Sequence, residues 1–573
     1  MAISTPLQSP GIFVREIDLT GVVPNVPTST GAFVGEFNWG PVEEPRLISN
    51  ETGLVEVFGS PDSDNSVEWH SAAYFLRYSN ELQVVRAVES ATNAYDPASG
   101  ATAPLVKNRD NFDIQISALN DSDHTFIAKY PGAVGNSISV HWLSAGNDSD
   151  WENWTYKNNF DSKPTTSSHA TDAGATNDEV HIAVVDTDGV IGGTRGAVLE
   201  TFAFTSIAKG ALNPDGSSNY ILDRINNGSA YVWMAGFGSG QFSTNAGTEV
   251  ASGKNYIFAG VTSNQVDFEG GTNGNPLDVG DYATGFDQFE DKENILVDFL
   301  IAPGMNSRTD QKTVVNDLVS IAQGTRKDCV VVTSPARSDI INNTDPTTAA
   351  VTTAATFTSS SYLVVDNNYL KIYDKYNDQY IFIPAASSVA GIMAATDAVA
   401  APWFSPAGPR RGQLLGITSL AYTPNQVQRD TLYKAGINPI ANIPGQGVML
   451  YGDKTKLARP SAFDRINVRR LFLGIERAIA VAARNVMFEF NDEFTRAEFK
   501  NVVEPFLREI QGRRGITDFR VVCDETNNTP AVIDRNEFVC SIFIKPARSI
   551  NFVTLNFVAV RTGVDFEEVV GTV

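Results

Sequence analysis

The longest helical pattern in the chain lies in its last third. Apolar residues recur at spacings of three to five from Ile466 to Val486, which places them on one face of a helix. A second helical pattern follows, and Thr495 with Glu498 three residues later predicts a capping box at its start. This second helix is expected to end at Gly512 and to carry on one side Phe499, Val502, Val503, Phe506 and Leu507.

After these helices the period changes to alternation, which is typical of half-buried strands. The first run contains Phe538, Cys540, Ile542 and Ile544, and the second, over 550–560, contains Phe552, Thr554, Leu555 and Phe557. A third run at the C-terminus comprises Val564, Asp565, Phe566, Glu567, Glu568 and Val569. Because nothing follows this last strand to cover its edge, we expect the edge to be blunted or to pair with another chain.

The chain begins as it ends, with a short alternating pattern between residues that break strands. The pattern comprises Ile12, Phe13, Val14, Arg15, Glu16 and Ile17, and Gly21 and Pro24 follow it. The pattern leaves open whether this strand is an edge of the chain's own sheet or is donated to a neighbour. The first eleven residues hold no long apolar run, so we expect neither a secretory signal nor membrane insertion.

Between the ends, buried-strand and helix patterns alternate. They predict strand 31–37, helix 67–79, strand 82–88, strand 295–302, helix 307–323, strand 329–332, strand 362–365 and helix 388–400. Short links within 295–332 favour a parallel, right-handed strand–helix–strand unit, whereas 339–360 is expected to be a loop. The intervening 93–281 is rich in Asp, Asn, Ser, Thr and Gly and predicts one or two inserted β-rich domains. The fold class is therefore α/β, of mixed α+β character.

Composition narrows the function classes. The chain has 43 Lys and Arg against 66 Asp and Glu, a formal net charge of −23 that would repel a phosphate backbone and argues against direct nucleic-acid binding. The three cysteines (329, 523 and 540) are too few and too widely spaced for a disulfide framework or metal cluster. We expect them to be small core residues in a reducing cytosol.

A search for catalytic, cofactor or metal sites finds none that is complete. The histidines have no ligand partner at metal spacing, and those in strand patterns, His141 and His181, are expected to pack. The glycine-rich stretch 236–240 lacks the helix and the Lys-Ser/Thr pair of a phosphate loop. The stretch 186–189 lacks the further acidic ligands of a calcium loop and predicts a turn. We expect no enzyme activity and no cofactor.

Six segments together carry a family resemblance. They are 9–18, 28–35, 38–42, 402–408, 435–440 and 469–485, the last with Arg465 beside it. In this order they resemble the sheath proteins of contractile bacteriophage tails, over nearly the whole chain except about 93–285. The resemblance implies a structural subunit that forms a helical homo-oligomer of six-fold rings around an inner tail tube. It also implies baseplate and tail terminator partners, assembly in the host cytoplasm, a place in the virion, and contraction that drives the tube through the host envelope for genome ejection.

The resemblance also assigns roles to the segments. The expected parts are an N-terminal arm 1–20, a platform 21–92 and 282–410, an outer insert 93–281, an inner domain 411–561 and a C-terminal arm 562–573. The alternating terminal runs would be donated by β-augmentation to the sheet that contains 538–544 and 552–557 of neighbouring subunits, with hinges at Gly21, Pro24 and Gly563.

Local charge suggests a contact with the tube. Residues 459–514 carry eleven positive against eight negative side chains. This excess is either a solvated face with intrahelical ion pairs or a basic surface facing an acidic tube, to which Arg469, Arg470, Arg477 and Arg484 would contribute. Two alternatives for the whole chain remain: the sheath of a related contractile injection machine such as a tailocin, and an α/β enzyme or binding module, which would need a pocket with convergent polar groups.

Overall fold

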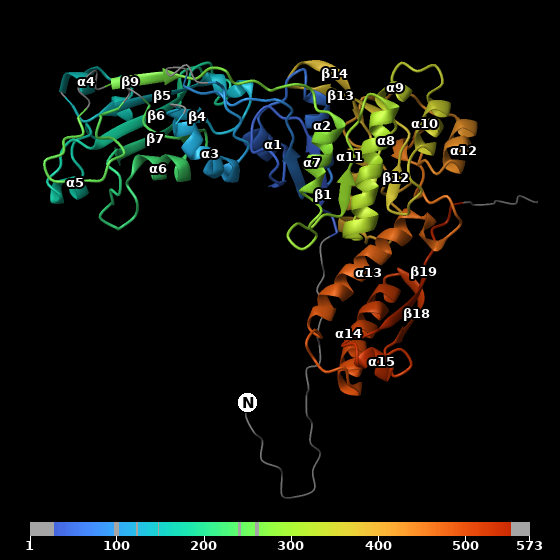
Figure 1. Ribbon diagram of the computed structural model, residues 1–573. Coiled ribbons are helices and arrows are strands. Elements are labelled where there is room, and N and C mark those ends of the chain that lie inside the picture. Colours follow the sequence, from blue (N-terminus) through green and yellow to red (C-terminus); the bar gives the residue numbers. More distant parts are fainter. Residues whose placement is uncertain are drawn as a thin grey trace, which may run out of the picture. The chain divides into compact units, whose positions relative to one another are not determined.

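The computed structural model describes residues 28–96, 102–121, 124–146, 148–238, 242–257 and 263–551 (Figure 1). These residues divide into two compact units. The larger contains the described part of Asn25–Pro402 together with Pro406–Arg477, and the smaller contains Trp403–Ser405 and the described part of Ala478–Val573. The two terminal arms, the three hinge residues, and Phe552, Thr554, Leu555 and Phe557 lie outside the described residues.

A six-stranded sheet forms the centre of the larger unit, in the order β12-β11-β10-β1-β3-β2. Neighbouring strands are parallel except β2, which pairs antiparallel with β3 at one edge. The strands are β1 Gly31–Gly35, β2 Arg46–Ile48, β3 Leu82–Arg86, β10 Phe299–Ile301, β11 Val330–Thr333 and β12 Leu363–Val365. Except in the edge strand β2, their central residues are apolar and buried because both faces of the sheet are covered.

Helices cover the two faces of this sheet. Helices α1 (Glu51–Phe58), α2 (Ser66–Phe75) and α11 (Ala386–Val399) share one core with alternate residues of the strands, among them Phe33, Val84 and Phe299. Helices α7 (Val279–Asp287), α8 (Arg308–Ser320) and α10 (Pro346–Ala355) share the other core with Ala32, Val85 and Leu300. The parallel pairing of the predicted strand–helix–strand unit is confirmed, since β10 and β11 are parallel neighbours joined through α8.

Some expected elements differ from the structure. The expected loop 339–360 overlaps the end of α9 (Arg337–Ile340) and contains all of α10. Helix α10 begins with Pro346 in its first turn, and the Asp345 side chain accepts a hydrogen bond from the Thr348 N–H at 3.2 Å. Thr and Ala fill much of α10, so it lacks the apolar stripe that marks a helix in the sequence. Helix α8 ends earlier than expected, and a π-helical segment, Ile321–Arg326, follows it.

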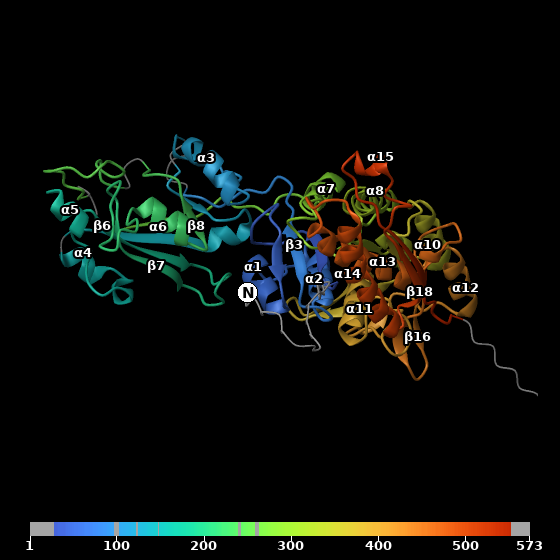
Figure 2. The ribbon, with the colours of Figure 1, turned by 90° about the horizontal axis from the view of Figure 1, so that it is seen from below.

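The expected β-rich insert is built on an antiparallel sheet in the order β7-β6-β5-β9, with a separate pair β4-β8. The strands are β4 Phe126–Ala128, β5 Ile138–Ser144, β6 Glu179–Asp186, β7 Ala197–Ser206, β8 Val232–Met234 and β9 Ser263–Asp267. The helices are α3 Arg109–Asp121, α4 Asp148–Asn153, α5 Ser168–Asp172 and α6 Ile221–Gly228, of which α6 lies beside β7 and β8 (Figure 2). His181 packs as expected, with its ring stacked 4.3 Å from that of Phe160.

The remaining elements of the larger unit lead toward its last helix. They are β13 Tyr369–Asp374, β14 Gln379–Pro384, β15 Ser419–Leu420, α12 Gln426–Lys434, β16 Ile440–Ile443 and β17 Gly447–Leu450. Helix α13, Ile466–Arg484, then begins in the larger unit and ends in the smaller one. Within the described part of the chain, no helix is both long and apolar enough to cross a membrane.

The smaller unit contains α14 (Glu493–Gly512), α15 (Pro530–Ile533) and the antiparallel pair β18 (Ile516–Val522) and β19 (Ser541–Pro546). Helix α14 ends at Gly512 as expected. The predicted Thr495 cap is wrong, because the Asp492 carboxylate accepts from the Thr495 N–H at 2.8 Å and the helix starts three residues earlier. The predicted strand over 538–544 is also shifted: Ile542 and Ile544 lie in β19, whereas Phe538 and Cys540 precede it.

Candidate functional site

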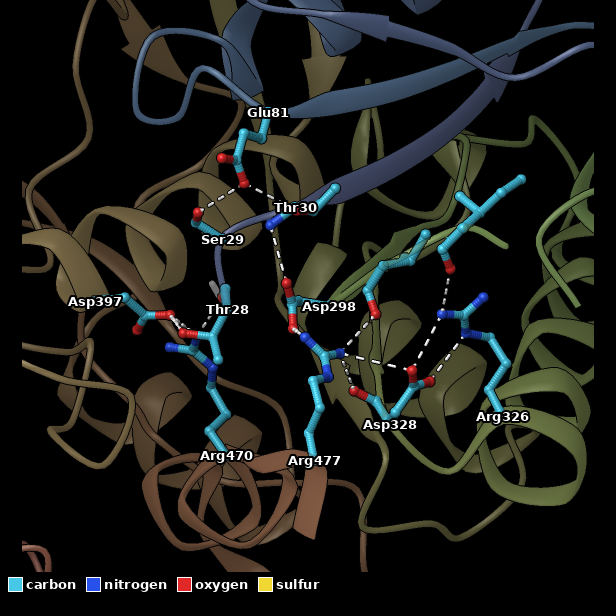
Figure 3. A network of polar contacts seen from close by, with 12 residues as sticks. Thr28, Ser29, Thr30, Glu81, Asp298, Arg326, Asp328, Asp397, Arg470 and Arg477 are labelled. Carbon is cyan, nitrogen blue, oxygen red and sulfur yellow. Dashed lines mark hydrogen bonds and ion pairs between the residues drawn. The ribbon is translucent and has the colours of Figure 1, made fainter. Parts of the chain in front are cut away.

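The first described residues, 28–30, are held by side chains from distant parts of the larger unit (Figure 3). The Thr28 hydroxyl donates to the Asp397 carboxylate at 2.6 Å, and the Thr28 carbonyl accepts from Arg470 Nη2 at 3.2 Å. The Thr30 N–H donates to Asp298 Oδ2 at 3.0 Å. The Ser29 and Thr30 hydroxyls both donate to the Glu81 carboxylate. These contacts fix the backbone directly before β1.

Arg470 and Arg477 reach these carboxylates from α13. They are seven residues apart, so two helical turns place them on the same face. Arg470 Nη2 lies 2.5 Å from Asp397 Oδ2, and its Nη1 donates to the Met393 carbonyl at 2.9 Å. Arg477 Nη1 lies 2.6 Å from Asp298 Oδ1. The helix is therefore tied to α11 and to the residue before β10.

A third arginine extends the set. Arg326 binds Asp328 in a forked arrangement, with Nε 2.9 Å from Oδ1 and Nη2 3.1 Å from Oδ2. Arg477 Nη2 lies 3.6 Å from the same carboxylate and donates to the Asp328 carbonyl at 2.9 Å. We call Arg326, Arg470, Arg477, Asp298, Asp328 and Asp397 the arginine–aspartate network, which balances three positive charges against three negative ones.

Burial makes this network depend on its partners. The side chains of Arg470, Arg477, Asp298 and Asp397 are each 9% exposed or less. Burial raises the pKa of Asp298 to about 6, against the opposing effect of Arg477, and it also raises the pKa of Asp397. Removing one partner of a buried pair typically costs about 3–5 kcal/mol, although such a pair adds little over an apolar replacement of both partners. Each buried charge of the network therefore depends on its partner.

Three of the four arginines that the sequence analysis assigned to a basic inner surface have side chains that are largely buried. Arg470 and Arg477 are buried in the network, and Arg469 is 8% exposed. The Arg469 guanidinium lies over the rings of Tyr362 and Phe463, at 4.3 and 4.2 Å, and donates to the Ser361 hydroxyl. The aspartates that neutralise the network come from remote segments, which a local charge count does not include. Arg484 is the exposed member of the four.

Exposed apolar side chains gather beyond Arg484, where the sequence analysis expected no site. They are Met487 at 58% exposed, Phe488 at 101%, Phe490 at 83% and Phe494 at 75%. We call residues 487–494 the phenylalanine loop, which connects α13 to the first turn of α14 within the smaller unit. Four large apolar side chains within eight residues of sequence are thus left exposed, which makes this loop a candidate for contact with another molecule. In the sequence, these side chains could be recognised as exposed because they do not follow the helical period of α13.

The structure bears on the calcium loop and the metal sites that the sequence raised. Asp186 accepts hydrogen bonds from the backbone N–H groups of residues 189–192 at 2.7–3.1 Å, which confirms the predicted turn. Among the described residues, no group of three or more His, Cys, Asp or Glu side chains could hold a metal ion. The cavity beside Arg470 and Arg477 has a free volume of about 10 Å³, which is room for no more than one water.

Comparison with known proteins identifies relatives along the whole chain. The family models for the phage tail sheath protein central domain and the phage tail sheath C-terminal domain match residues 276–456 and 458–559. The tail sheath protein of Vibrio phage KVP40 is 33% identical, over 99% of this chain and 100% of the relative. That of Enterobacteria phage T4 is also 33% identical, over 99% of both chains. A crystal structure of a sheath tail protein from Listeria innocua shares the fold, with a TM-score of 0.53 at 14% identity, covering 92% of this chain and 97% of that one.

Proposed function

This chain belongs to the phage tail sheath protein family, and we propose that its copies stack in six-fold rings around an inner tail tube and contract during infection. The observation that carries the proposal is the match to two tail sheath proteins over 99% of this chain. The role is structural and places the protein in the virion. Baseplate and tail terminator proteins would bound the sheath, which would assemble in the host cytoplasm.

Contraction needs a subunit that moves as a rigid body while its connections bend. The arginine–aspartate network supports this requirement, because it fixes residues 28–30, the segment next to the N-terminal arm, to the larger unit through Asp397, Arg470 and Asp298. The chain would then bend before residues 28–30, at the proposed hinges Gly21 and Pro24. Near the C-terminus it would bend at Gly563. The sheath would store its energy in the extended arrangement and release it as new contacts form between subunits, which drives the tube through the host envelope.

The arms would connect subunits by adding strands to neighbouring sheets. Residues 12–17 and 564–569 are the proposed donated strands, and β19 with residues 552–557 is the proposed receiving sheet. The pair β18-β19 supports this role because, among the described residues, it is a sheet of two strands, whose outer edges offer backbone groups for pairing. Such a contact is heterologous, so it continues along a helix instead of closing a dimer.

We propose that Arg484 and the phenylalanine loop contact the inner tube. Arg484 keeps the role that the sequence analysis gave to four arginines, since it is exposed. Apolar side chains beside it would add contact area that does not depend on salt, whereas Arg484 would add attraction that salt screens. Reversing the charge with Arg484→Glu should weaken tube-templated assembly most strongly at low salt. The same reversal at Arg195, whose side chain is 78% exposed in the β-rich insert, is the matched control.

A proline scan of the N-terminal arm tests the assembly model. Val14→Pro removes a backbone N–H in the middle of the proposed donated strand, so it should abolish assembly into tubes while the subunit keeps its circular dichroism spectrum. Ser4→Pro, which lies before the alternating pattern, should assemble normally. Deleting residues 1–20 or 562–573 should likewise give folded subunits that do not assemble. Tubes of normal width from Val14→Pro or from either deletion would contradict the arm model.

A further inference from the structure

Two cysteines face one another at the end of the β18-β19 pair. The antiparallel register places Val521 opposite Ile542 and Val522 opposite Ser541. One step further along the same register places Cys523 opposite Cys540. Directly opposed residues of antiparallel strands have Cβ atoms about 4.5–5.5 Å apart, which is close to the separation that a disulfide spans.

The two thiols lie close enough for each to be the largest influence on the pKa of the other, and Cys523 Sγ lies 3.9 Å from the Val539 carbonyl oxygen. Asn528 holds the backbone beside them, since its side chain accepts from the Val539 N–H at 2.9 Å and donates to the Val539 carbonyl at 2.8 Å. The Asn527 side chain donates to the Val522 carbonyl at 2.7 Å on the opposite strand. Both cysteines therefore sit on backbone that is already aligned.

Cys523 and Cys540 differ in exposure and in the direction of their pKa shifts. Cys540 is partly exposed, whereas Cys523 is 6% exposed. The hydrogen bond with Cys540 lowers the pKa of Cys523, and the nearby charges of Arg496 and Lys500 act in the same direction. The same contact, together with burial, raises the pKa of Cys540. The accessible sulfur is thus paired with a buried sulfur that is the better thiolate.

We propose that Cys523 and Cys540 form a redox-controlled disulfide when the protein meets a low-molecular-weight disulfide. The bond would link the residue after β18 to the residue before β19. Cys540 reacts first because it is the accessible sulfur: it gives its thiol proton to solvent, attacks one sulfur of that reagent and releases the first reduced thiol, leaving a mixed disulfide on Cys540. The Cys523 thiolate then attacks the Cys540 sulfur and releases the second. Two protein thiols are oxidised and one reagent disulfide is reduced to two thiols.

The oxidising conditions that would form this disulfide follow from the proposed function. Only this part of the inference rests on the proposed function. A sheath subunit is made in a reducing cytoplasm, where the thiols persist, and leaves in a particle that meets oxidising surroundings. The disulfide would then lock the hairpin that contains the proposed receiving sheet. Cys329 offers an internal comparison, because it is fully buried and burial raises its pKa to about 12.

The test uses the full-length protein, oxidised with glutathione disulfide while folded, then alkylated in denaturant and analysed by mass spectrometry. We expect alkylated cysteines to fall from three to one, with a single disulfide-linked peptide pair that contains residues 523 and 540, and a reductant to restore all three. Cys329→Ala should form the same disulfide. Cys523→Ser should stop at a mixed disulfide on Cys540.

Three results would overturn the proposal. They are a wild-type protein that keeps three alkylatable thiols, one that stops at the mixed disulfide, and one whose disulfides join two molecules. None of these readouts requires assembly, so failure of the disulfide and failure of the sheath function are distinguishable.

Discussion

Arg477 and Asp298 form a buried ion pair, with 2.6 Å between Nη1 and Oδ1 and both side chains 9% exposed. The arginine lies on α13 and the aspartate directly before β10, and the same aspartate accepts from the Thr30 N–H before β1. One carboxylate thus ties the last helix of the larger unit to two central strands. Residues 28–30, which this carboxylate helps to hold, follow the proposed N-terminal arm in the sequence.

Arg477→Met should lower the free energy of unfolding of the larger unit by about 3–5 kcal/mol, because it leaves Asp298 buried without its charge partner. Guanidinium chloride unfolding followed by tryptophan fluorescence measures the change. Arg484→Met, at an exposed position of the same helix, should alter it by no more than about 0.5 kcal/mol. Equal effects of the two variants would contradict the assigned role of the network.

Stability of the larger unit should fall as pH rises from about 5 to 7. Burial raises the pKa of Asp366 from 3.8 to about 7, although Ser334 and the Asn368 N–H donate to its carboxylate. In this window the folded state keeps a proton on Asp366 that the unfolded state has released, so each pH unit lowers the free energy of unfolding by about 1.4 kcal/mol. Burial also raises the pKa of Glu36 to about 7, so Glu36 likewise lowers the free energy of unfolding as pH rises through this window. Asp366→Asn has no proton to release, so its free energy of unfolding, measured by denaturation at several pH values between 5 and 7, should fall less steeply with pH than that of the wild type. An unchanged dependence on pH would refute the assignment.

Packing between α7 and β1 should not tolerate a methyl group at Gly285. A Cβ there would lie 2.4 Å from Val34 Cγ1, deep in the core, so Gly285→Ala should destabilise the protein by about 1–3 kcal/mol. Gly324→Ala is the matched control, since a Cβ at that position meets no atom within 4 Å. Thermal unfolding compares the two variants, and a neutral Gly285→Ala would show that the helix and strand are less closely packed.

The phenylalanine loop should matter for assembly and not for folding. Phe488→Asp should reduce tube-templated assembly at least tenfold, measured as sheath protein that sediments with tubes, because an exposed aromatic contact is replaced by a solvated charge. Ile114→Asp replaces another strongly exposed apolar side chain, on α3, and should assemble like the wild type. If both variants assemble equally well, the loop does not face the tube.

The central elements of the fold could be predicted from the sequence because their signals are local. Strands β1, β10 and β11 consist, apart from Thr333, of apolar residues and glycine buried on both faces, and the apolar stripe of α13 repeats at the helical period. Helices α10 and α12 could not be found in this way, since the first is rich in Thr and Ala and the second is mostly polar. Tertiary packing and their capping residues, not an apolar stripe, specify them.

The candidate site was less predictable because its partners are remote in sequence. The four arginines of α13 look alike in the sequence, yet Arg470 and Arg477 are neutralised by Asp397 and Asp298 from other elements, whereas Arg484 is exposed. Only the folded chain brings these groups together. The contact between the two cysteines depends likewise on strand register, which spacing in the sequence does not reveal.

Electron microscopy of the purified full-length protein with its tail tube protein tests the sheath proposal most directly. We predict striated tubes of uniform width with six-fold rings, either spontaneously at high concentration or on the tube as a template. Separate globular particles that leave preformed tubes bare under both conditions would contradict the proposed function.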